Sequence, residues 1–206
     1  MTILSQNTSD TNTERSFAAL RAAYPAWEDV MGAAEGDLVD VLRSGGLANQ
    51  KAPRIQAVLR TLHAEPHGFD LRWLGDVPPE EAQDWLTALP GVGPKTAACV
   101  LLFSLDVPVM PVDTHVHRVS RRLGLIGDRV SADAAHAILT EMTPDGEMLS
   151  AHLLLIGHGR RTCRARNPRC GECVLALDCP SAVVPGAAPD SDTGTDSGSV
   201  PESVTE

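Results

Sequence analysis

The sequence predicts an all-α fold. Apolar residues recur at helical spacing through most of the chain, and no segment shows the strict alternation of a half-buried strand. No internal repeat is visible. Aromatic residues make up only 3% of the chain, so we expect a core built mainly from alanine, leucine and valine.

Eight helices account for this pattern. We expect them over residues 13–23, 37–43, 53–63, 82–89, 94–105, 114–123, 132–142 and 148–156. The first carries Phe17 and Leu20 on one face, and the second is stopped by Gly45 and Gly46. The fifth begins at Pro94, whose fixed backbone angle suits the first helical position. The others are marked by apolar residues three and four positions apart.

The charge is unevenly distributed along the 206 residues. The net charge is −10, but five acidic residues and no basic ones follow Cys179. Residues 183–206 are rich in Pro, Gly, Ser, Thr and Asp, which predicts a disordered acidic tail. Ten of the 17 basic residues fall between Lys95 and Arg169. An acidic protein with one basic face can still bind DNA, with modest non-specific affinity.

No stretch of the sequence is long and apolar enough for a membrane span. A polar run follows Met1, where a signal peptide would be apolar, so we expect a cytoplasmic protein. In that compartment clustered cysteines bind metals more often than they form disulfides. Cys99 lies apart in an apolar helical run and is expected to be a small core residue.

Four cysteines near the end of the chain form the pattern C-x6-C-x2-C-x5-C. They are Cys163, Cys170, Cys173 and Cys179. Four such thiolates satisfy either a tetrahedral Zn²⁺ or the irons of a cubane cluster. Arginines crowd the same stretch, namely Arg160, Arg161, Arg164, Arg166 and Arg169. This positive charge indicates that the cysteine-rich segment faces phosphate.

Residues 89–97, with the sequence Leu-Pro-Gly-Val-Gly-Pro-Lys-Thr-Ala, join two of the expected helices through a tight turn. Gly91 and Gly93 allow backbone angles and a close approach that side chains would block. The free N–H groups of the turn and of the next helix N-terminus form an anion site. The alternative is a helix corner without a ligand. Phosphate contacts at such a turn position a protein without reading base sequence.

Lys95 and Asp113 are the candidate catalytic pair. Lys95 lies on the first turn of a helix, where the helix N-terminus and partial burial favour the uncharged amine, a nucleophile suited to Schiff-base chemistry. The alternative is a simple phosphate contact. Asp113, in the run Val-Asp-Thr-His-Val-His-Arg, is a natural N-cap. A carboxylate held there can also take a proton or stabilise a developing cation.

These three elements together resemble the endonuclease III family, DNA glycosylases and abasic-site lyases of the helix-hairpin-helix superfamily. The match runs from about residue 4 to residue 180, and its hairpin, Val-Asp-Thr-His and cysteine motifs occur in the family's order. The resemblance implies a six-helix barrel domain with the hairpin, here residues 1–107, and a helical iron-sulfur domain, residues 108–182. It also implies a [4Fe-4S] cluster on the four cysteines.

The resemblance implies base-excision repair of oxidised pyrimidines in double-stranded DNA. Lys95 would attack C1′ of the deoxyribose and form an imine, and β-elimination would then nick the strand. Asp113 would assist departure of the base and activate the amine. The target nucleotide has to be rotated out of the duplex to reach Lys95. The enzyme would work as a monomer on the bacterial nucleoid.

Further DNA contacts are implied at both ends of the match. The implied contacts are Gln6, Asn7, Gly91, Gly93, Arg164, Arg166 and Arg169. Residues 4–10 resemble the family segment whose glutamine fills the gap left by the extruded base; Asn7 occupies that position and Gln6 precedes it, and we favour Asn7. Asp10 matches an aspartate that braces the active-site loop. The family has helices ahead of this segment, so the start is assigned too late or these helices are missing.

Two other functions compete with this prediction. A monofunctional mismatch glycosylase of the same superfamily has serine or tyrosine at the position of Lys95, so Lys95 argues against it. A non-catalytic iron-sulfur DNA-binding or electron-transfer module would use Asp113 only as a cap. Structural Zn²⁺ in place of the cluster would leave the protein colourless.

Overall fold

The computed structural model describes residues 1–183, and this part of the chain contains helices and no strand. Its α-helices are α1 (Asp10–Ala23), α2 (Trp27–Gly32), α3 (Glu35–Leu42), α4 (Ala48–Ala64), α5 (Pro79–Thr87), α6 (Pro94–Leu105), α7 (Thr114–Arg122), α8 (Ala132–Met142) and α9 (Met148–Arg161). Short 3-10 turns lie at Arg43–Gly45, Arg72–Gly75, Asp145–Glu147 and Cys170–Glu172. The predicted all-α class is confirmed.

The predicted boundaries hold for α6 and α8 and differ elsewhere for identifiable reasons. Helix α4 starts five residues before the expected position, with Pro53 inside it. Pro53 is the sixth helical residue, so it removes the one hydrogen bond that its N–H would donate to the Asn49 carbonyl, while its fixed φ is compatible with the helix. Helix α2 was missed because its six residues are too few to show a period. The expected acidic tail, apart from Val183, lies outside the described residues.

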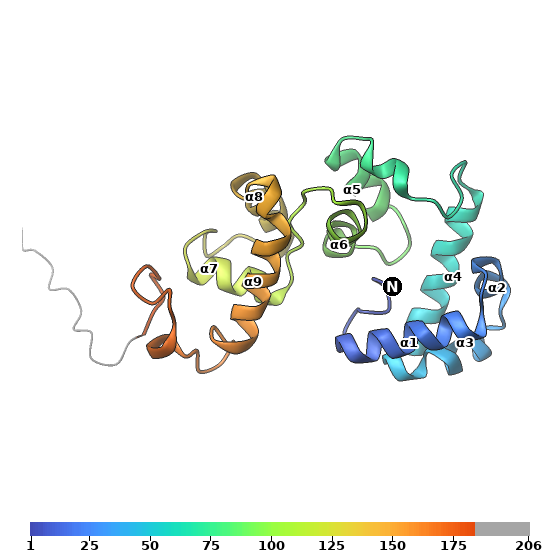
Figure 1. The fold of residues 1–206 in the computed structure, drawn as a ribbon, viewed down its shortest axis with the longest axis horizontal. Coiled ribbons are helices and arrows are strands. Elements are labelled where there is room, and N and C mark those ends of the chain that lie inside the picture. Colours follow the sequence, from blue (N-terminus) through green and yellow to red (C-terminus); the bar gives the residue numbers. More distant parts are fainter. Residues whose placement is uncertain (184–206) are drawn as a thin grey trace, which may run out of the picture.

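The helices form two groups joined by a single connection (Figure 1). Helices α1 to α6 enclose two apolar clusters, one around Leu38 among α1 to α4 and one around Leu101 among α4 to α6. A third cluster, around Val116, joins the end of α6 to α7, α8 and α9. None of the helices between residues 1 and 183 is long and apolar enough to cross a membrane. The domain boundary expected between residues 107 and 108 stays a prediction.

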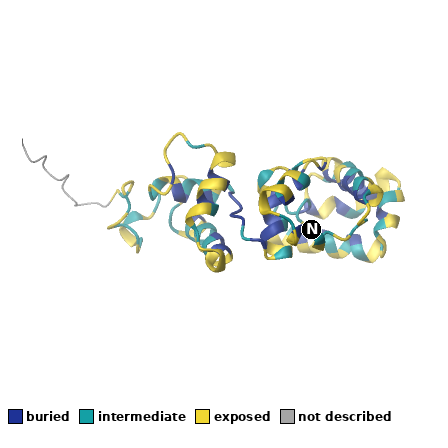
Figure 2. Ribbon diagram, turned by 90° about the horizontal axis from the view of Figure 1, so that it is seen from above, coloured by how far each residue is buried: buried dark blue, intermediate teal, exposed yellow. Residues whose placement is uncertain are grey.

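The connection from α6 to α7 is buried, as the dark blue segment between the two groups in Figure 2 indicates. Met110 is 1% exposed, and its N–H donates to Thr140 Oγ1 of α8 at 2.9 Å. The N–H of Val112 donates to His136 Nε2, also of α8, at 3.1 Å. Because α8 satisfies these backbone groups, the connection enters α7 in a fixed position.

A buried lysine anchors the N-terminal segment. Lys51 of α4 is 2% exposed, and its Nζ donates to the carbonyl oxygens of Leu4 at 2.7 Å and of Gly45 at 2.9 Å. Burial lowers the pKa of Lys51. The two hydrogen bonds tie residues 1–9 to the turn before α4, and residues 1–9 include Gln6 and Asn7.

Replacing Lys51 by methionine keeps most of the side-chain volume but leaves two buried carbonyl oxygens without a donor. We expect Lys51→Met to lower the free energy of unfolding by about 2 kcal/mol, measured by urea denaturation. Arg43→Met is the matched control, because Arg43 pairs with Asp40 at an exposed site and should change stability by less than about 0.5 kcal/mol. Equal stability of the two variants would contradict an anchoring role for Lys51.

Candidate active site and iron-sulfur site

The turn between α5 and α6 has the geometry that its glycines require. Gly91 has a φ of +73°, and a Cβ placed there would lie 2.9 Å from Cδ of Arg54. Leu89 and Val92 are buried, and the N–H of Val92 donates to the Leu89 carbonyl at 3.1 Å. The apolar side chains therefore fix the turn from the inside, while the glycine backbone remains exposed.

This turn presents its donors to solvent. Within residues 1–183 no hydrogen bond engages the N–H of Gly91 or Gly93. The helix α6 begins directly afterwards, with Pro94 at its first position and Lys95 at its second. Unpaired N–H groups beside a helix N-terminus are suited to bind an anion such as a phosphate.

Asp113 is held rigidly at the start of α7. Its Oδ1 accepts hydrogen bonds from the N–H groups of His115 and Val116, both at 2.8 Å, so Asp113 is the N-cap that the sequence predicts. Oδ2 has no hydrogen bond within residues 1–183. The side chain is half-buried. The cap thus fixes a carboxylate at one place while leaving one oxygen unpaired.

Lys95 and Asp113 line the same cleft, of about 1010 Å³, between the two groups of helices. Its wall also contains Asn7, Cys99 and His152. Lys95 is exposed, so the expected partial burial of this residue is wrong. It lies at the second position of α6. A cleft of this size accommodates a nucleotide.

The thiol of Cys99 belongs to the cleft wall as well as to the core. It is 5% exposed, which fits the expected small core residue. Burial raises the pKa of this thiol, the positive charge of Lys95 opposes the rise, and the negative charge of Asp113 adds to it. Cys99 therefore stays a neutral thiol. Because both charges act on its pKa, Lys95 and Asp113 both lie near Cys99 on α6.

Gln6 and Asn7, the two candidates for the residue that fills the gap in the duplex, have different surroundings in the structure. Gln6 Nε2 lies 3.2 Å from Thr96 Oγ1 and 3.4 Å from the Gly91 carbonyl, so this side chain is bonded to the hairpin. Asn7 lines the cleft and has a φ of +53°, in the left-handed region. Gln6 thus supports the turn, whereas Asn7 faces the space beside Lys95.

Asp10 connects the two groups of helices. Its Oδ2 lies 3.5 Å from Nη1 of Arg160, which is on α9, and both side chains are more than half exposed. An exposed ion pair at this distance contributes little to stability. It nevertheless places the first turn of α1 opposite α9 at the edge of the cleft, where Asp10 was expected to brace the site.

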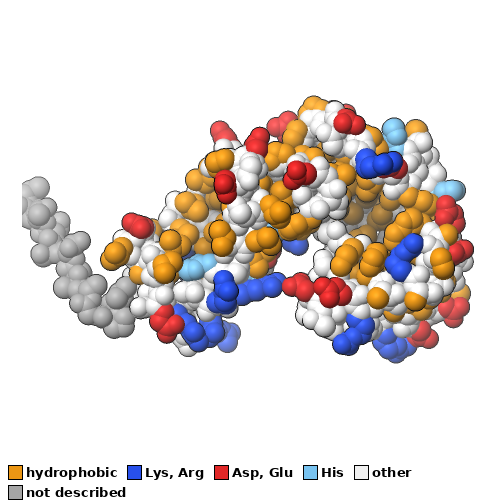
Figure 3. Space-filling view, in the orientation of Figure 1, with side chains coloured by type: hydrophobic (Ala, Val, Ile, Leu, Met, Phe, Trp, Pro, Cys, Tyr) orange, Lys and Arg blue, Asp and Glu red, His pale blue; other side chains and the backbone are white. Residues whose placement is uncertain are grey.

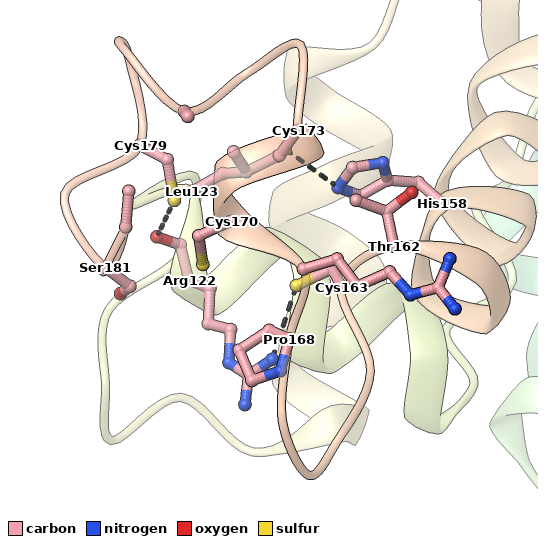
Figure 4. A pocket seen from close by; sticks show the side chains of 13 residues that line it. Arg122, Leu123, His158, Thr162, Cys163, Pro168, Cys170, Cys173, Cys179 and Ser181 are labelled. Atoms are coloured by element: carbon pink, nitrogen blue, oxygen red, sulfur yellow. Dashed lines mark hydrogen bonds between the residues drawn. The ribbon is translucent and has the colours of Figure 1, made fainter. Parts of the chain in front are cut away.

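The four cysteines surround one pocket (Figure 4). They are Cys163, Cys170, Cys173 and Cys179, all of them free thiols. Within residues 1–183 no three His, Cys, Asp or Glu side chains converge closely enough on one metal ion. A cubane places each thiolate on a different iron, so its ligands stand around a volume like this pocket. The donor set and its arrangement fit the cluster.

Two side chains contact these sulfur atoms directly. Arg122 Nη1, at the end of α7, donates to Cys163 Sγ at 3.4 Å (Figure 4). The same nitrogen donates to the Arg164 carbonyl at 2.7 Å. His158 Nε2 lies 3.7 Å from Cys173 Sγ, and burial together with the positive Arg161 lowers the pKa of this histidine. The loop after α9 is thus held from both α7 and α9.

The predicted arginine-rich loop is exposed. Arg164, Arg166 and Arg169 all point away from the core, and Arg169 lies 3.6 Å from Glu172. Figure 3 shows Lys and Arg side chains gathered on the lower side of this part of the molecule. The sequence prediction of a basic surface beside the cysteines therefore agrees with the structure.

Sequence reasoning missed His152. It lies on α9, is 2% exposed and lines the cleft that holds Lys95 and Asp113. A single histidine in an apolar helical run carries no motif. The only sequence signal was its position on the inward face of α9, and that position is equally typical of an ordinary buried core residue.

The comparisons with known proteins agree with this site. The sequence profile of the HhH-GPD superfamily base excision DNA repair proteins matches residues 1–145, and that of the iron-sulfur binding domain of endonuclease III matches residues 163–179. Fold and site therefore define a helix-hairpin-helix protein of base-excision repair.

Individual relatives and solved structures show to which family within this class the chain belongs. Endonuclease III of Thermotoga maritima is 37% identical over 178 residues, which are 86% of this chain and 79% of that protein. A protein of Arabidopsis thaliana whose name describes a DNA glycosylase is also 37% identical, over 77% of this chain, and the chain spans 54% of its length. A non-covalent complex of endonuclease III with DNA has a TM-score of 0.75 and 32% identity, covering 87% of this chain and 80% of that one. The chain belongs to the endonuclease III family, and its cofactor is a [4Fe-4S] cluster.

Loss of one cysteine ligand should remove the cluster and its colour. We expect Cys173→Ser to contain less than about a tenth of the wild-type iron, with the broad visible absorption lost, because hydroxyl oxygen is a poor substitute for thiolate. Cys99→Ala is the matched control and should keep the full iron content. Equal iron in both variants would contradict the assignment of the pocket as the cluster site.

Proposed function

We propose that this chain is a bifunctional DNA glycosylase and abasic-site lyase that removes oxidised pyrimidines from double-stranded DNA. The observation that carries the proposal is that Lys95 and Asp113 line one cleft directly beside a hairpin with unpaired N–H groups. The hairpin would hold the DNA backbone at its phosphates. The cleft would receive the nucleotide rotated out of the duplex.

Lys95 would be the nucleophile. Its exposed side chain, on the first turn of α6, gives the amine access to a sugar in the cleft. The nitrogen would attack C1′ as the bond from C1′ to the base breaks, and the base would leave with the bonding electrons. Nitrogen would then lose a proton and the C1′–O4′ bond would break, with O4′ taking up a proton, so that the sugar ring opens and the imine forms. Removal of a C2′ proton then expels the 3′ phosphate, which breaks the strand on the 3′ side of the lesion.

Asp113 would stabilise the positive charge that develops on the sugar while the base departs. Its Oδ1 is engaged by two backbone N–H groups, so the carboxylate has little freedom to turn away. A fixed charge in a partly enclosed site stabilises a developing cation more than a mobile one does, because no reorganisation is needed. The same carboxylate can accept a proton from the Lys95 nitrogen.

The cysteine-rich loop would bind the DNA backbone. We assign Cys163, Cys170, Cys173 and Cys179 as the cluster ligands, in the pocket that they surround. The cluster would hold the loop in shape. Its exposed arginines, Arg164, Arg166 and Arg169, would then contact phosphates. We propose that the enzyme acts at the bacterial nucleoid in the cytoplasm, since its proposed substrate is duplex DNA. We also propose that the enzyme acts as a monomer, with residues 1–107 and 108–182 as its two domains.

Strand cleavage should depend on Lys95 completely and on Asp113 strongly. We expect Lys95→Ala to leave no β-elimination product on a thymine glycol duplex, because the proposed imine forms on the Lys95 amine. Asp113→Asn should slow base release about 100-fold, within the usual range for a positioned acid or base. Incision of labelled duplexes that contain thymine glycol, dihydrouracil, 5-hydroxycytosine, uracil or an abasic site measures both effects and ranks the lesions.

Arg43→Ala serves as the control, because Arg43 is exposed and lies outside the cleft. It should cleave at the wild-type rate. Full cleavage by Lys95→Ala would rule out the imine. Unchanged base release by Asp113→Asn would leave Asp113 as a cap and would favour a different acid.

We propose that Asn7 occupies the gap in the duplex and that Gln6 supports the hairpin. Asn7→Ala should then slow incision of a fully paired duplex about tenfold, since the extruded state loses its replacement contact. Cleavage of an abasic site in single-stranded DNA, where no gap needs filling, should stay within about twofold of wild type. If Gln6→Ala gave this duplex-specific loss and Asn7→Ala did not, the two roles would be reversed.

A further inference from the structure

One buried polar atom in the cleft wall has no partner. Among residues 1–183, two buried side-chain atoms lack a hydrogen bond, Ser120 Oγ and His152 Nδ1. Of these two residues, His152 is the one that lines the cleft with Lys95 and Asp113. A buried unpaired nitrogen costs stability, so its presence beside a reactive amine calls for a functional reason.

The ring of His152 is held in place by packing. Its centroid lies 5.4 Å from that of Phe103 in an edge-to-face arrangement, and Phe103 also lines the cleft. Phe103 is 50% exposed and covers the ring from the α6 side. The ring therefore stays in one position although no hydrogen bond fixes Nδ1.

A second buried histidine shows the ordinary arrangement. His136 is 4% exposed, but its Nε2 accepts from the Val112 N–H at 3.1 Å and its Nδ1 lies 3.0 Å from the Ala132 carbonyl. Both ring nitrogens of His136 are thus satisfied by backbone groups. His152 differs in having a nitrogen left over.

The charge state of His152 leaves that nitrogen as an acceptor. Burial lowers the pKa of His152, the negative Asp113 and a backbone hydrogen bond with Pro111 oppose this, and the positive Lys95 lowers the pKa further. The ring is therefore neutral at neutral pH. A neutral imidazole has one N–H and one lone pair, and Nδ1 holds the lone pair in the tautomer whose proton is on Nε2.

We propose that Nδ1 of His152 accepts a hydrogen bond from the Lys95 amine when DNA occupies the cleft, and that His152 is a positioning residue for the nucleophile. The inference rests on the proposed lyase function. Lys95 is exposed, and the four-carbon stem of a lysine is flexible. One N–H held by His152 would leave the nitrogen lone pair in a fixed direction, toward C1′ of a sugar in the cleft.

Three substitutions of His152 test the proposal. Leucine fills the space without an acceptor, asparagine places an amide oxygen near the position of Nδ1, and glutamine places one near Nε2. The readouts are the single-turnover rate of borohydride-trapped adduct on an abasic duplex and the free energy of unfolding. We expect His152→Leu to trap about tenfold more slowly, as expected for the loss of one hydrogen bond. His152→Asn should trap near the wild-type rate, and faster than His152→Gln.

Stability separates this role from a structural one. His152→Leu should be destabilised less than His136→Leu, because Nδ1 of His152 is unpaired. His136→Leu is the matched control and should be less stable, since it leaves the Val112 N–H without an acceptor. If His152→Leu does not fold, the comparison of the Asn and Gln variants still tests the acceptor position.

Wild-type trapping by His152→Leu would overturn the proposal. Equally slow trapping by the Leu, Asn and Gln variants would also overturn it, because the rate would not depend on an acceptor at Nδ1. No adduct with the wild-type enzyme would be a different failure, since it would refute the proposed lyase function itself.

Discussion

Two hydrogen bonds at the start of α7 hold the candidate active site together. Asp113 Oδ1 accepts from the His115 and Val116 N–H groups, which begins the helix and fixes the carboxylate at the same time. The preceding connection is buried and bonded to α8, so Asp113 cannot shift along the chain. Backbone geometry therefore sets the position of the Asp113 carboxylate, and in the proposed reaction it would supply a charge that needs no rearrangement.

The other end of α7 holds the iron-sulfur site. Arg118 donates to the Cys163 carbonyl at 3.1 Å, and Arg122 donates to the sulfur of the same cysteine and to the loop that follows. A helix of nine residues thus has the proposed catalytic carboxylate at its first turn and the first cluster cysteine against its last turn. The basic loop and the cleft are consequently placed on one rigid element, which suits two contacts with one DNA duplex.

Local motifs carried most of what the sequence could predict. The hairpin, the cap at Asp113 and the cysteine spacing each depend on neighbouring residues, so their geometry follows from short stretches of chain. Contacts between distant residues were not accessible in this way. Gln6 is bonded to a turn 85 positions away, and that contact distinguishes it from Asn7. His152 becomes notable only because α6, α7 and α9 meet around it, and the exposure of Lys95 likewise depends on how α6 lies at the cleft.

In the proposed reaction the Lys95 amine forms a covalent bond with the sugar. It is tested most directly by peptide mapping, with mass spectrometry, of wild-type protein reduced with borohydride on an abasic duplex. We expect one modified peptide, with the adduct on Lys95. An adduct on another residue, or unmodified Lys95 in protein that has cleaved the strand, would contradict the account.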